Sequence, residues 1–229
     1  MKAAALLISA YDAASHARWA AGVSRACSNY AWQHISMPPR HFSWRIRGSA
    51  LSLLDARYRS MLIDPPDVLL TTSMLDLATA RALVPSLRHC PAVVYFHENQ
   101  FAYPSARDDQ NDVQLLTLKT ALAADQVVFN SDWNRSSFVE GANALLRKMP
   151  DAVPPRLLDQ VVEKSQILPV PLDDDLFASF TPRDRDRCLR IVWNHRWEHD
   201  KGGERLLAAL RELRGLDCVF ELHVCGQQF

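Results

Sequence analysis

The feature that most constrains the fold is the alternation of short apolar runs with segments whose apolar residues follow helical spacing. Residues 3–10 form the first run, and the residues up to Tyr30 then change to helical spacing, with Ser15 placed to cap the helix. Further runs rich in β-forming residues occupy 67–72, 92–96, 126–130, 189–194 and 218–225. The segments 112–124, 133–146, 154–162 and 203–214 are expected to be helices. Apolar strands separated by helices indicate a doubly wound parallel sheet covered on both faces.

The chain is predicted to contain two unequal α/β units. Around residues 172–187 the composition changes to a charged stretch without periodicity, which is typical of a linker. We therefore predict a Rossmann-like domain over residues 1–172, a linker over 173–188 and the first strand–helix–strand unit of a second Rossmann-like domain over 189–229. A unit of about 40 residues with one helix cannot cover both faces of its sheet. We therefore expect that the chain is truncated, or that this unit is completed by something absent from the sequence.

Charge, hydropathy and cysteine content exclude several classes of protein. Lys plus Arg number 26 and Asp plus Glu number 26, so the net charge is zero and any site for a polyanion must be local. The longest apolar run is far shorter than the roughly 20 residues of a membrane-spanning helix, and no signal-peptide cleavage pattern follows it. Five cysteines are odd in number and lack Cys-x-x-Cys spacing, which predicts reduced thiols in a cytoplasmic protein.

The best functional candidates are polar residues that directly follow the predicted strands, because ligands bind beyond the carboxyl ends of parallel strands. Ser15 and His16 follow the first strand at a helix start, although an ordinary strand-to-helix turn also explains them. His97, Glu98 and Asn99 follow the run 92–96 and offer an acid–base group with several hydrogen-bonding partners. The alternative for His97 is a hydrogen-bonded structural histidine.

Two further strand ends carry candidates. Asn130 and Ser131 follow the run 126–130, where capping of the next helix is a sufficient explanation. Arg196 and Lys201 share one loop before a predicted helix, where two cations and the helix dipole can hold a diphosphate. Solvated surface cations are the alternative.

The same loop raises the question of a metal. His195, Glu198 and His199 are possible zinc ligands, but no recognisable ligand spacing occurs elsewhere in the chain. We therefore predict no metal.

One segment is locally basic. Arginine contacts phosphate and aromatic rings stack on splayed bases, so this segment is a candidate RNA-binding surface. A solvated helix and turn with core aromatics is the alternative. The segment has Asp55 as its one acidic residue, and its basic and aromatic members are Arg40, His41, Phe42, Trp44, Arg45, Arg47, Arg57, Tyr58 and Arg59.

Four longer segments carry a family resemblance. Arg-x-x-x-x-Lys-Gly at residues 196–202 resembles the donor-diphosphate motif of retaining GT-B glycosyltransferases of the family-4 type. The chain as a whole resembles the tRNA-queuosine α-mannosyltransferase family, with order and spacing maintained from Tyr11 to Gly226. The segments that carry the resemblance are Phe-Ser-Trp-Arg-Ile-Arg at 42–47, Tyr-Phe-His-Glu-Asn-Gln at 95–100 followed by Tyr103-Pro104, Val-Phe-Asn-Ser at 128–131, and His-Arg-Trp-Glu-His-Asp-Lys at 195–201.

The resemblance implies a cytoplasmic GT-B enzyme that transfers mannose from GDP-mannose to queuosine in tRNA, without a further cofactor. It implies that His97 and Glu98 lie near the reacting sugar and that Arg196 and Lys201 neutralise the leaving diphosphate, so a metal is unnecessary. The alternatives are a non-catalytic RNA-binding Rossmann-like module and a glycosyltransferase with another donor and a small-molecule acceptor. The residues implied at the donor and acceptor loops are Ser15, His16, Asn99, Asn130 and Ser131, and those at the tRNA surface are Arg40, Trp44, Arg45 and Arg47.

Overall fold

The computed structural model of the chain describes residues 2–102, 111–177, 188–195 and 201–226. The chain divides into two compact units, Met1–Pro171 and Leu172–Phe229.

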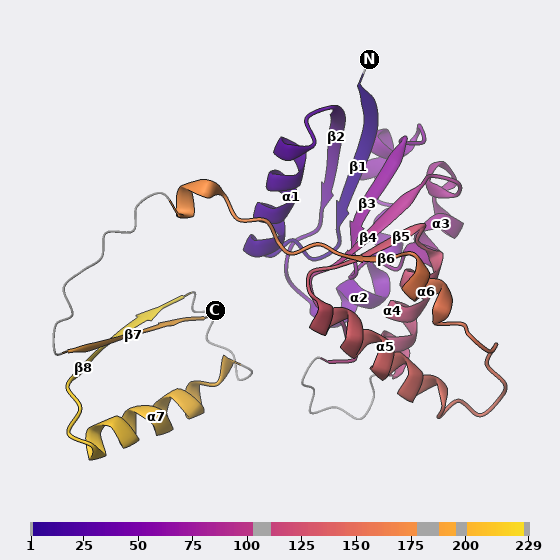
Figure 1. Cartoon of the computed structure of the whole chain (residues 1–229). Helices are drawn as coiled ribbons and strands as arrows, with labels where there is room; N and C mark the ends of the chain where they lie inside the picture. The colour runs from indigo at the N-terminus through magenta and orange to yellow at the C-terminus, as the bar shows by residue number, and fades with distance from the viewer. Residues whose placement is uncertain (1, 103–110, 178–187, 196–200, 227–229) are drawn as a thin grey trace. The chain divides into compact units, whose positions relative to one another are not determined.

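The larger unit is built on a parallel sheet in the order β2-β1-β3-β4-β5-β6 (Figure 1). Every neighbouring pair of these strands is parallel. The predicted parallel α/β architecture is therefore confirmed. The strands are β1 (Ala3–Ser9), β2 (Tyr30–Ser36), β3 (Val68–Thr72), β4 (Ala92–Phe96), β5 (Gln126–Phe129) and β6 (Ser165–Ile167).

Neither edge strand of the sheet was predicted from the sequence. In β2 the side chains are largely accessible, so the strand lacks the apolar run that marks the central strands, and its first residue was assigned to the preceding helix. That helix, α1 (Ala14–Ala26), ends at Ala26 rather than at Tyr30. Strand β6 has three residues, which is too short for a periodic signal.

Helices cover the two faces of the sheet unequally. On one face, Trp19 and Ala20 of α1 pack with Leu7 and Tyr95. The opposite face carries the main core, with apolar residues from all the later helices of this unit. Those helices are α2 (Phe42–Ser52), α3 (Leu77–Leu83), α4 (Asn111–Ala123), α5 (Asp132–Leu146) and α6 (Asp159–Glu163), with 3-10 turns η1 (Ala56–Leu62) and η2 (Pro85–Leu87).

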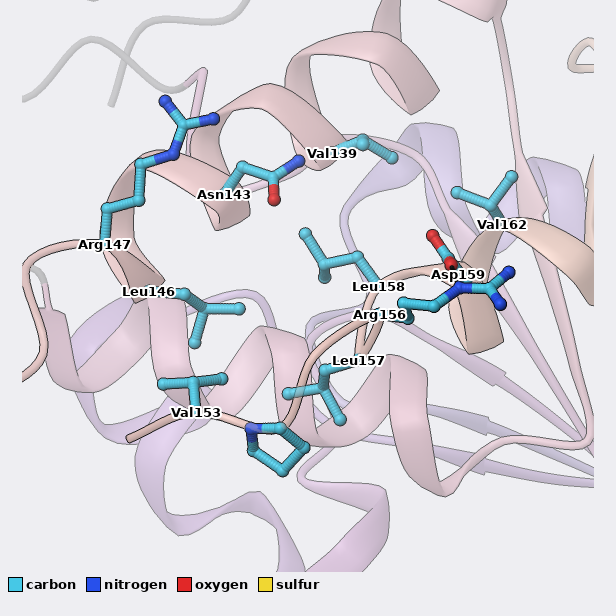
Figure 2. Close-up of a pocket in the computed structure, with 11 residues that line it drawn as sticks. Val139, Asn143, Leu146, Arg147, Val153, Arg156, Leu157, Leu158, Asp159 and Val162 are labelled. Atoms are coloured by element: carbon cyan, nitrogen blue, oxygen red, sulfur yellow. Dashed lines mark hydrogen bonds and ion pairs between the residues drawn. The ribbon is translucent and has the colours of Figure 1, made fainter. Parts of the chain in front are cut away.

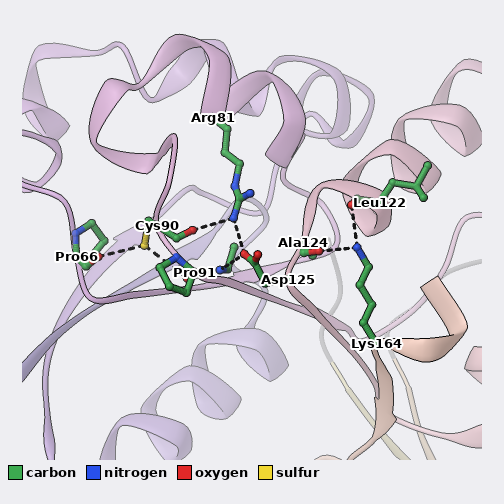
Figure 3. A network of polar contacts seen from close by, with 9 residues as sticks. Pro66, Arg81, Cys90, Pro91, Leu122, Ala124, Asp125 and Lys164 are labelled. Carbon is green, nitrogen blue, oxygen red and sulfur yellow. Dashed lines mark hydrogen bonds and ion pairs between the residues drawn. The ribbon is translucent and has the colours of Figure 1, made fainter. Parts of the chain in front are cut away.

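A polar network closes the amino-terminal edge of the sheet (Figure 3). The Asp125 carboxylate accepts a hydrogen bond from the backbone N–H of Ala92 at 2.8 Å and from Arg81 at 2.7 Å, and Arg81 also donates to the carbonyl of Cys90. Burial raises the pKa of Asp125, but the hydrogen bonds from Ala92 and Arg81 outweigh it and hold the pKa below its usual value. The network thus joins the starts of β4 and β5.

The side chain of Lys164, the residue after α6, caps the C-terminal end of α4 in the same region. Its Nζ donates to the carbonyls of Leu122 at 2.8 Å and Ala124 at 2.5 Å (Figure 3). These carbonyls lie at the helix C-terminus and lack intrahelical partners, so the ammonium satisfies them and complements the helix dipole. Burial lowers the pKa of Lys164.

The smaller unit pairs β7 (Leu189–Asn194) in parallel with β8 (Phe220–Cys225), and α7 (Gly203–Gly215) connects them. A 3-10 turn, η3 (Asp174–Leu176), lies within the segment predicted as a linker, of which residues 178–187 lie outside the described part. Among the described residues of α7, none is buried. The predicted strand–helix–strand unit is present.

The described residues show neither a membrane-spanning helix nor a disulfide bond. None of their helices has both the length and the hydropathy of a membrane-spanning segment. All five cysteines have free thiols.

Candidate functional site

The order of the strands reverses the direction of winding between β1 and β3. From β1 the chain first moves outward to β2 and then returns to β3 on the other side, so the direction of winding reverses between β1 and β3. Ligands of open α/β sheets bind at such a reversal. Ser9 and Thr72 end the two strands, and His97 follows the next strand, β4.

His97 lies in an aromatic cage at this edge. Its ring stacks on His16 of α1, with centroids 4.1 Å apart and planes at 17°. Trp19 and Tyr95 meet the ring edge-on at 4.8 Å and 4.7 Å. The structure therefore brings together His97 and His16, two residues that the sequence singled out from segments about 80 residues apart.

The surroundings keep His97 neutral. Burial, and secondarily the neighbouring imidazole of His16, lower its pKa from 6.5 to about 3. An imidazole with this pKa carries no charge at neutral pH and offers one N–H donor and one bare nitrogen. His97 is therefore suited to orient polar groups by hydrogen bonding.

His16 is fixed by the loop that precedes its helix, because its Nδ1 lies 2.8 Å from the carbonyl of Tyr11. The prediction that Ser15 caps this helix is wrong. Helix α1 begins at Ala14, so Ser15 is already inside it, and the N-cap position belongs to Ala13, which has no side-chain hydrogen bond to offer. The start of α1 is thus formed by small residues without a capping side chain.

Asn99 anchors the loop that follows His97. Its Nδ2 donates to the carbonyl and to Oδ1 of Asn134, at 3.0 and 2.7 Å, while its Oδ1 accepts from the backbone N–H groups of Phe101 and Ala102. Asn99 is 3% exposed. Its amide is therefore engaged in holding the loop against α5.

Asn130 and Ser131 continue the same network. Asn130 donates to the carbonyl of His97 at 2.7 Å and accepts from Asn134 at 2.8 Å. Ser131 accepts from the backbone N–H of Asn134 at 3.2 Å, which confirms the predicted capping of α5. Both side chains fix the backbone that carries His97.

Glu98 is partly exposed beside this loop. Its carbonyl accepts a hydrogen bond from Ser73 Oγ at 3.3 Å, which ties the loop to the end of β3.

Buried polar atoms without a hydrogen-bond partner are concentrated near the carboxyl edge. Such atoms are uncommon in folded proteins, where an ordered water, an ion or a ligand is a frequent partner. Among the described residues they are Ser9 Oγ, Asp12 Oδ1, Arg45 Nε, Thr72 Oγ1 and His97 Nε2, with Arg81 Nε as the exception at the opposite edge.

The predicted RNA surface includes an exposed tryptophan. Trp44 in the first turn of α2 is 52% exposed. Its ring lies over Gly48, where a Cβ atom would come within 2.7 Å of ring carbons. Glycine thus provides the space in which the ring rests on the helix with its outer side accessible.

The arginines near Trp44 differ in their engagement. Arg47 donates to both carboxylate oxygens of Asp112, at 2.6 and 3.1 Å, and its hydrogen bond lowers the pKa of Asp112. Arg40 is exposed, and Arg45 makes no ion pair with any described residue. Arg47 therefore ties α2 to α4, whereas the other two are better placed to meet phosphate.

The predicted donor-diphosphate loop is described in part. Arg196 lies outside the described residues, whereas Lys201 directly precedes Gly202, the N-cap residue of α7 with φ at +72°. At the ends of the strands, a Cβ atom at Gly226 would collide with the carbonyl of His195. Both glycines are thus required by the backbone of this loop region.

One cavity of the larger unit lies away from the strand ends. Its volume is about 440 Å³, and it is formed between the second half of α5 and the segment leading to α6 (Figure 2). Apolar side chains such as Leu146 and Leu157 line it, with Arg147 and Arg156 among its polar members. None of the predicted site residues lies in its wall.

Comparison with known proteins identifies the larger unit. Residues 4–172 match the family described as "tRNA-queuosine alpha-mannosyltransferase N-terminal". The chain belongs to this family.

A relative and a solved structure extend the comparison. The "tRNA-queuosine alpha-mannosyltransferase" of Drosophila melanogaster is 31% identical over 234 residues, covering 98% of this chain and 61% of the relative. The chain thus spans about three fifths of the length of that relative. A structure described as "OtsA apo structure" matches with a TM-score of 0.55 and 12% identity over 97% of this chain and 65% of that chain. This likeness concerns the fold, which is of the GT-B type.

Within this member of the family, the described residues contain no cluster of three His, Cys, Asp or Glu side chains that could hold a metal ion. His199 and Glu198 lie outside the described part.

Several residues of the site were not among those predicted from the sequence. Trp19 and Tyr95 form the cage of His97, and helical spacing from His16 and alternation from His97 would have placed both on the correct face. Asn134 was missed although it stands three residues after the cap Ser131. Ser9 and Thr72 could have been found from the sequence, because each is a hydroxyl residue at the end of an apolar strand.

Proposed function

We propose that the chain is the acceptor-side domain, with the beginning of the donor-side domain, of a cytoplasmic retaining glycosyltransferase that transfers mannose from GDP-mannose to queuosine in tRNA. The observation that carries the proposal is the family match over residues 4–172. It is supported by the neutral imidazole of His97, which follows β4 beside the topological reversal of the sheet, where a polar ligand is expected.

The proposed roles follow from the geometry. His97 accepts a hydrogen bond from the reacting sugars or donates one to them. Because its imidazole is neutral, it does not repel the positive charge of an oxocarbenium-like transition state. Glu98 is proposed to contact a sugar hydroxyl beside it. Asn99, Asn130 and Ser131 are proposed to keep the His97 loop rigid, because their side chains are engaged within the protein.

The donor is proposed to bind through its diphosphate to Arg196 and Lys201 in front of α7. Charge develops on the diphosphate as the glycosidic bond breaks, so fixed cations and a helix N-terminus stabilise the transition state more than the ground state. In this proposal no metal or further cofactor takes part.

The tRNA is proposed to contact the surface formed by Arg40, Trp44 and Arg45. The accessible face of Trp44 can stack on an unpaired base, and the arginines can contact phosphates. Ser15 and His16 at the start of α1 complete the acceptor side.

A transfer assay tests the proposal. Mannose transfer from radiolabelled GDP-mannose is measured with queuosine-containing tRNA and with the same tRNA carrying guanosine at that position, using the Drosophila relative as positive control. We expect this chain to bind the queuosine tRNA more tightly and, once joined to the C-terminal part of the Drosophila relative that it does not cover, to transfer mannose only to that tRNA. The proposal fails if the relative is active while the joined chain transfers no mannose and this chain does not distinguish the two tRNAs.

A crossed pair of substitutions separates an enzyme from a passive RNA-binding module. His97→Ala should lower transfer far more than tRNA affinity, because the imidazole contacts the reacting groups. Replacing Arg40 and Arg45 by Ala should weaken tRNA binding and make it less salt dependent. Equal effects of the two changes on binding would favour the RNA-binding module.

A further inference from the structure

His16 lies in the same aromatic cage as His97, in the first turn of α1. It is 8% exposed. Its ring stacks on the ring of His97, with centroids 4.1 Å apart and planes at 17°. Because α1 follows β1 after a short turn, His16 lies at the carboxyl end of that strand, beside the reversal of the sheet where ligands of open α/β sheets bind.

A backbone carbonyl fixes which nitrogen of His16 carries the proton. Nδ1 of the ring lies 2.8 Å from the carbonyl oxygen of Tyr11. A carbonyl oxygen has no hydrogen to donate, so Nδ1 must carry the hydrogen and donate it. The neutral imidazole has only one N–H group, and Nε2 is therefore a bare nitrogen with a free lone pair.

Nε2 of His16 is open to a ligand. No hydrogen bond joins it to a described residue, and it is not among their buried polar atoms that lack a partner, so solvent reaches it. His97 differs, because its Nε2 is buried without a partner among the described residues. His16 thus presents a hydrogen-bond acceptor that a molecule arriving from solvent can contact.

The ring of His16 is held in place before any ligand arrives. Tyr11 fixes one edge of the ring and His97 covers one face. Trp19 and Tyr95 support His97 in turn, edge-on at 4.8 and 4.7 Å. An acceptor fixed in this way loses little conformational entropy when it binds a donor.

The chemistry of this nitrogen matches a hydroxyl group. A bare imidazole nitrogen accepts a hydrogen bond, and its lone pair repels the oxygens of a phosphate. The queuosine base carries a cyclopentene ring with two hydroxyl groups, which guanosine lacks. A site with a fixed hydrogen-bonding group discriminates against a ligand that lacks the matching hydroxyl.

We propose that His16 determines acceptor specificity: its bare Nε2 accepts a hydrogen bond from a hydroxyl of the queuosine diol, while the Tyr11 carbonyl holds the proton on Nδ1. This role rests on the proposed transferase function and adds to it the atom that recognises the diol. A hydrogen bond between neutral groups contributes roughly two- to tenfold in affinity.

The first measurement is the tautomer of His16 in the 229-residue chain. The chain is labelled with [15N]histidine and kept in mildly alkaline solution, and His16 is assigned by the resonances that are lost in His16→Gln. We expect the Nδ1–H form to predominate. An anticodon stem–loop RNA with queuosine should move the Nε2 resonance, whereas GDP-mannose should not. Movement with GDP-mannose alone would assign this nitrogen to the donor and overturn the proposal.

The second measurement is the affinity for three anticodon stem–loops. They carry queuosine, guanosine, or the queuosine base with its aminomethyl group but without the cyclopentene diol. His16→Asn keeps a donor for the Tyr11 carbonyl but has no atom at the position of Nε2. It should lower the affinity for the queuosine RNA by roughly two- to tenfold and leave the other two affinities unchanged.

Two matched variants separate recognition from the loss of an imidazole. His16→Gln places its amide oxygen near the position of Nε2 and should retain most of the affinity for the queuosine RNA. His34→Asn, at an exposed imidazole on β2, should change none of the three affinities.

The proposal is overturned by a predominant Nε2–H tautomer, by equal weakening of all three RNAs in His16→Asn, or by an unchanged preference for the queuosine RNA in that variant. If His16→Asn does not fold, the titration of the wild-type chain decides, and an unmoved Nε2 resonance at saturating queuosine RNA overturns the proposal. A failure of the proposed transferase function is recognised separately. It would appear as a chain with the expected tautomer and diol-dependent binding that transfers no sugar when joined to the C-terminal part of the relative.

Discussion

The neutral His97 makes the stability of the fold depend on pH in a defined window. The free energy of unfolding falls when the unfolded state binds a proton that the folded state does not. His97 has a pKa of about 3 in the folded chain, because of burial and secondarily of His16, and about 6.5 when unfolded. Its contribution is therefore fully present above pH 6.5 and is lost as the pH falls from there toward 3.

The size of the effect follows from the separation of the two pKa values. Each pH unit in which only the unfolded state is protonated costs about 1.4 kcal/mol. Because the ring remains partly accessible from the site, we discount this value and expect roughly 1–2 kcal/mol between pH 7 and pH 5. The carboxylates with lowered pKa, such as Asp125, lose their contribution only at lower pH.

The substitution His97→Gln isolates this contribution, because the amide has no charge change in the window. Urea unfolding is measured at intervals from pH 7 to pH 5, and the variant should lose less stability over this range than the wild type by the stated amount. His34→Gln, at an exposed imidazole on β2, controls for loss of an imidazole as such. Parallel curves for the wild type and His97→Gln would refute the reasoning.

Three further predictions concern the buried ammonium of Lys164, the surface around Trp44 and the stability of the smaller unit. Lys164→Met should lower the free energy of unfolding, measured by urea titration, by roughly 1–3 kcal/mol, because two helix carbonyls lose their hydrogen-bond donor. Lys148→Met, at an exposed site, should change this free energy little. Gly48→Ala should displace the ring of Trp44 and weaken tRNA binding in filter assays by roughly five- to a hundredfold. Gly22→Ala, where an added Cβ atom would meet no atom within 4 Å, should only stabilise α1. Amides of β7 and β8 should exchange with solvent faster than those of β1 and β3, because no described residue of α7 is buried; equal protection would contradict this.

The central strands were predictable because each is buried on both faces. Runs such as 92–96 must be apolar throughout, and this pattern is visible without any knowledge of the fold. The edge strand β2 has no such requirement, since much of its surface is accessible and its sequence includes Gln33 and His34. The apolar pattern that predicts a strand is therefore weaker where a large part of the strand's surface remains accessible.

The candidate site was predictable at the level of position. His16 and His97 were identified because each follows a strand, and parallel strands bring their carboxyl ends to one edge. Their stacking was not predictable, because it depends on how α1 packs over the sheet. The same holds for the lowered pKa of His97, which is a consequence of that packing.

The polar residues after the strands divide into two groups that a sequence pattern cannot separate. Asn99 and Asn130 use their amides within the protein, and this rigidity fixes the backbone on both sides of His97. His97 itself keeps an inner nitrogen without a partner among the described residues. A side chain whose hydrogen bonds are complete has little to offer a ligand, whereas an incomplete one must find its partner in water or substrate. Hydrogen-bond completeness, which only the structure supplies, therefore separates Asn99 and Asn130, whose amides support the loop, from His97, whose inner nitrogen is left able to bind a water or a ligand.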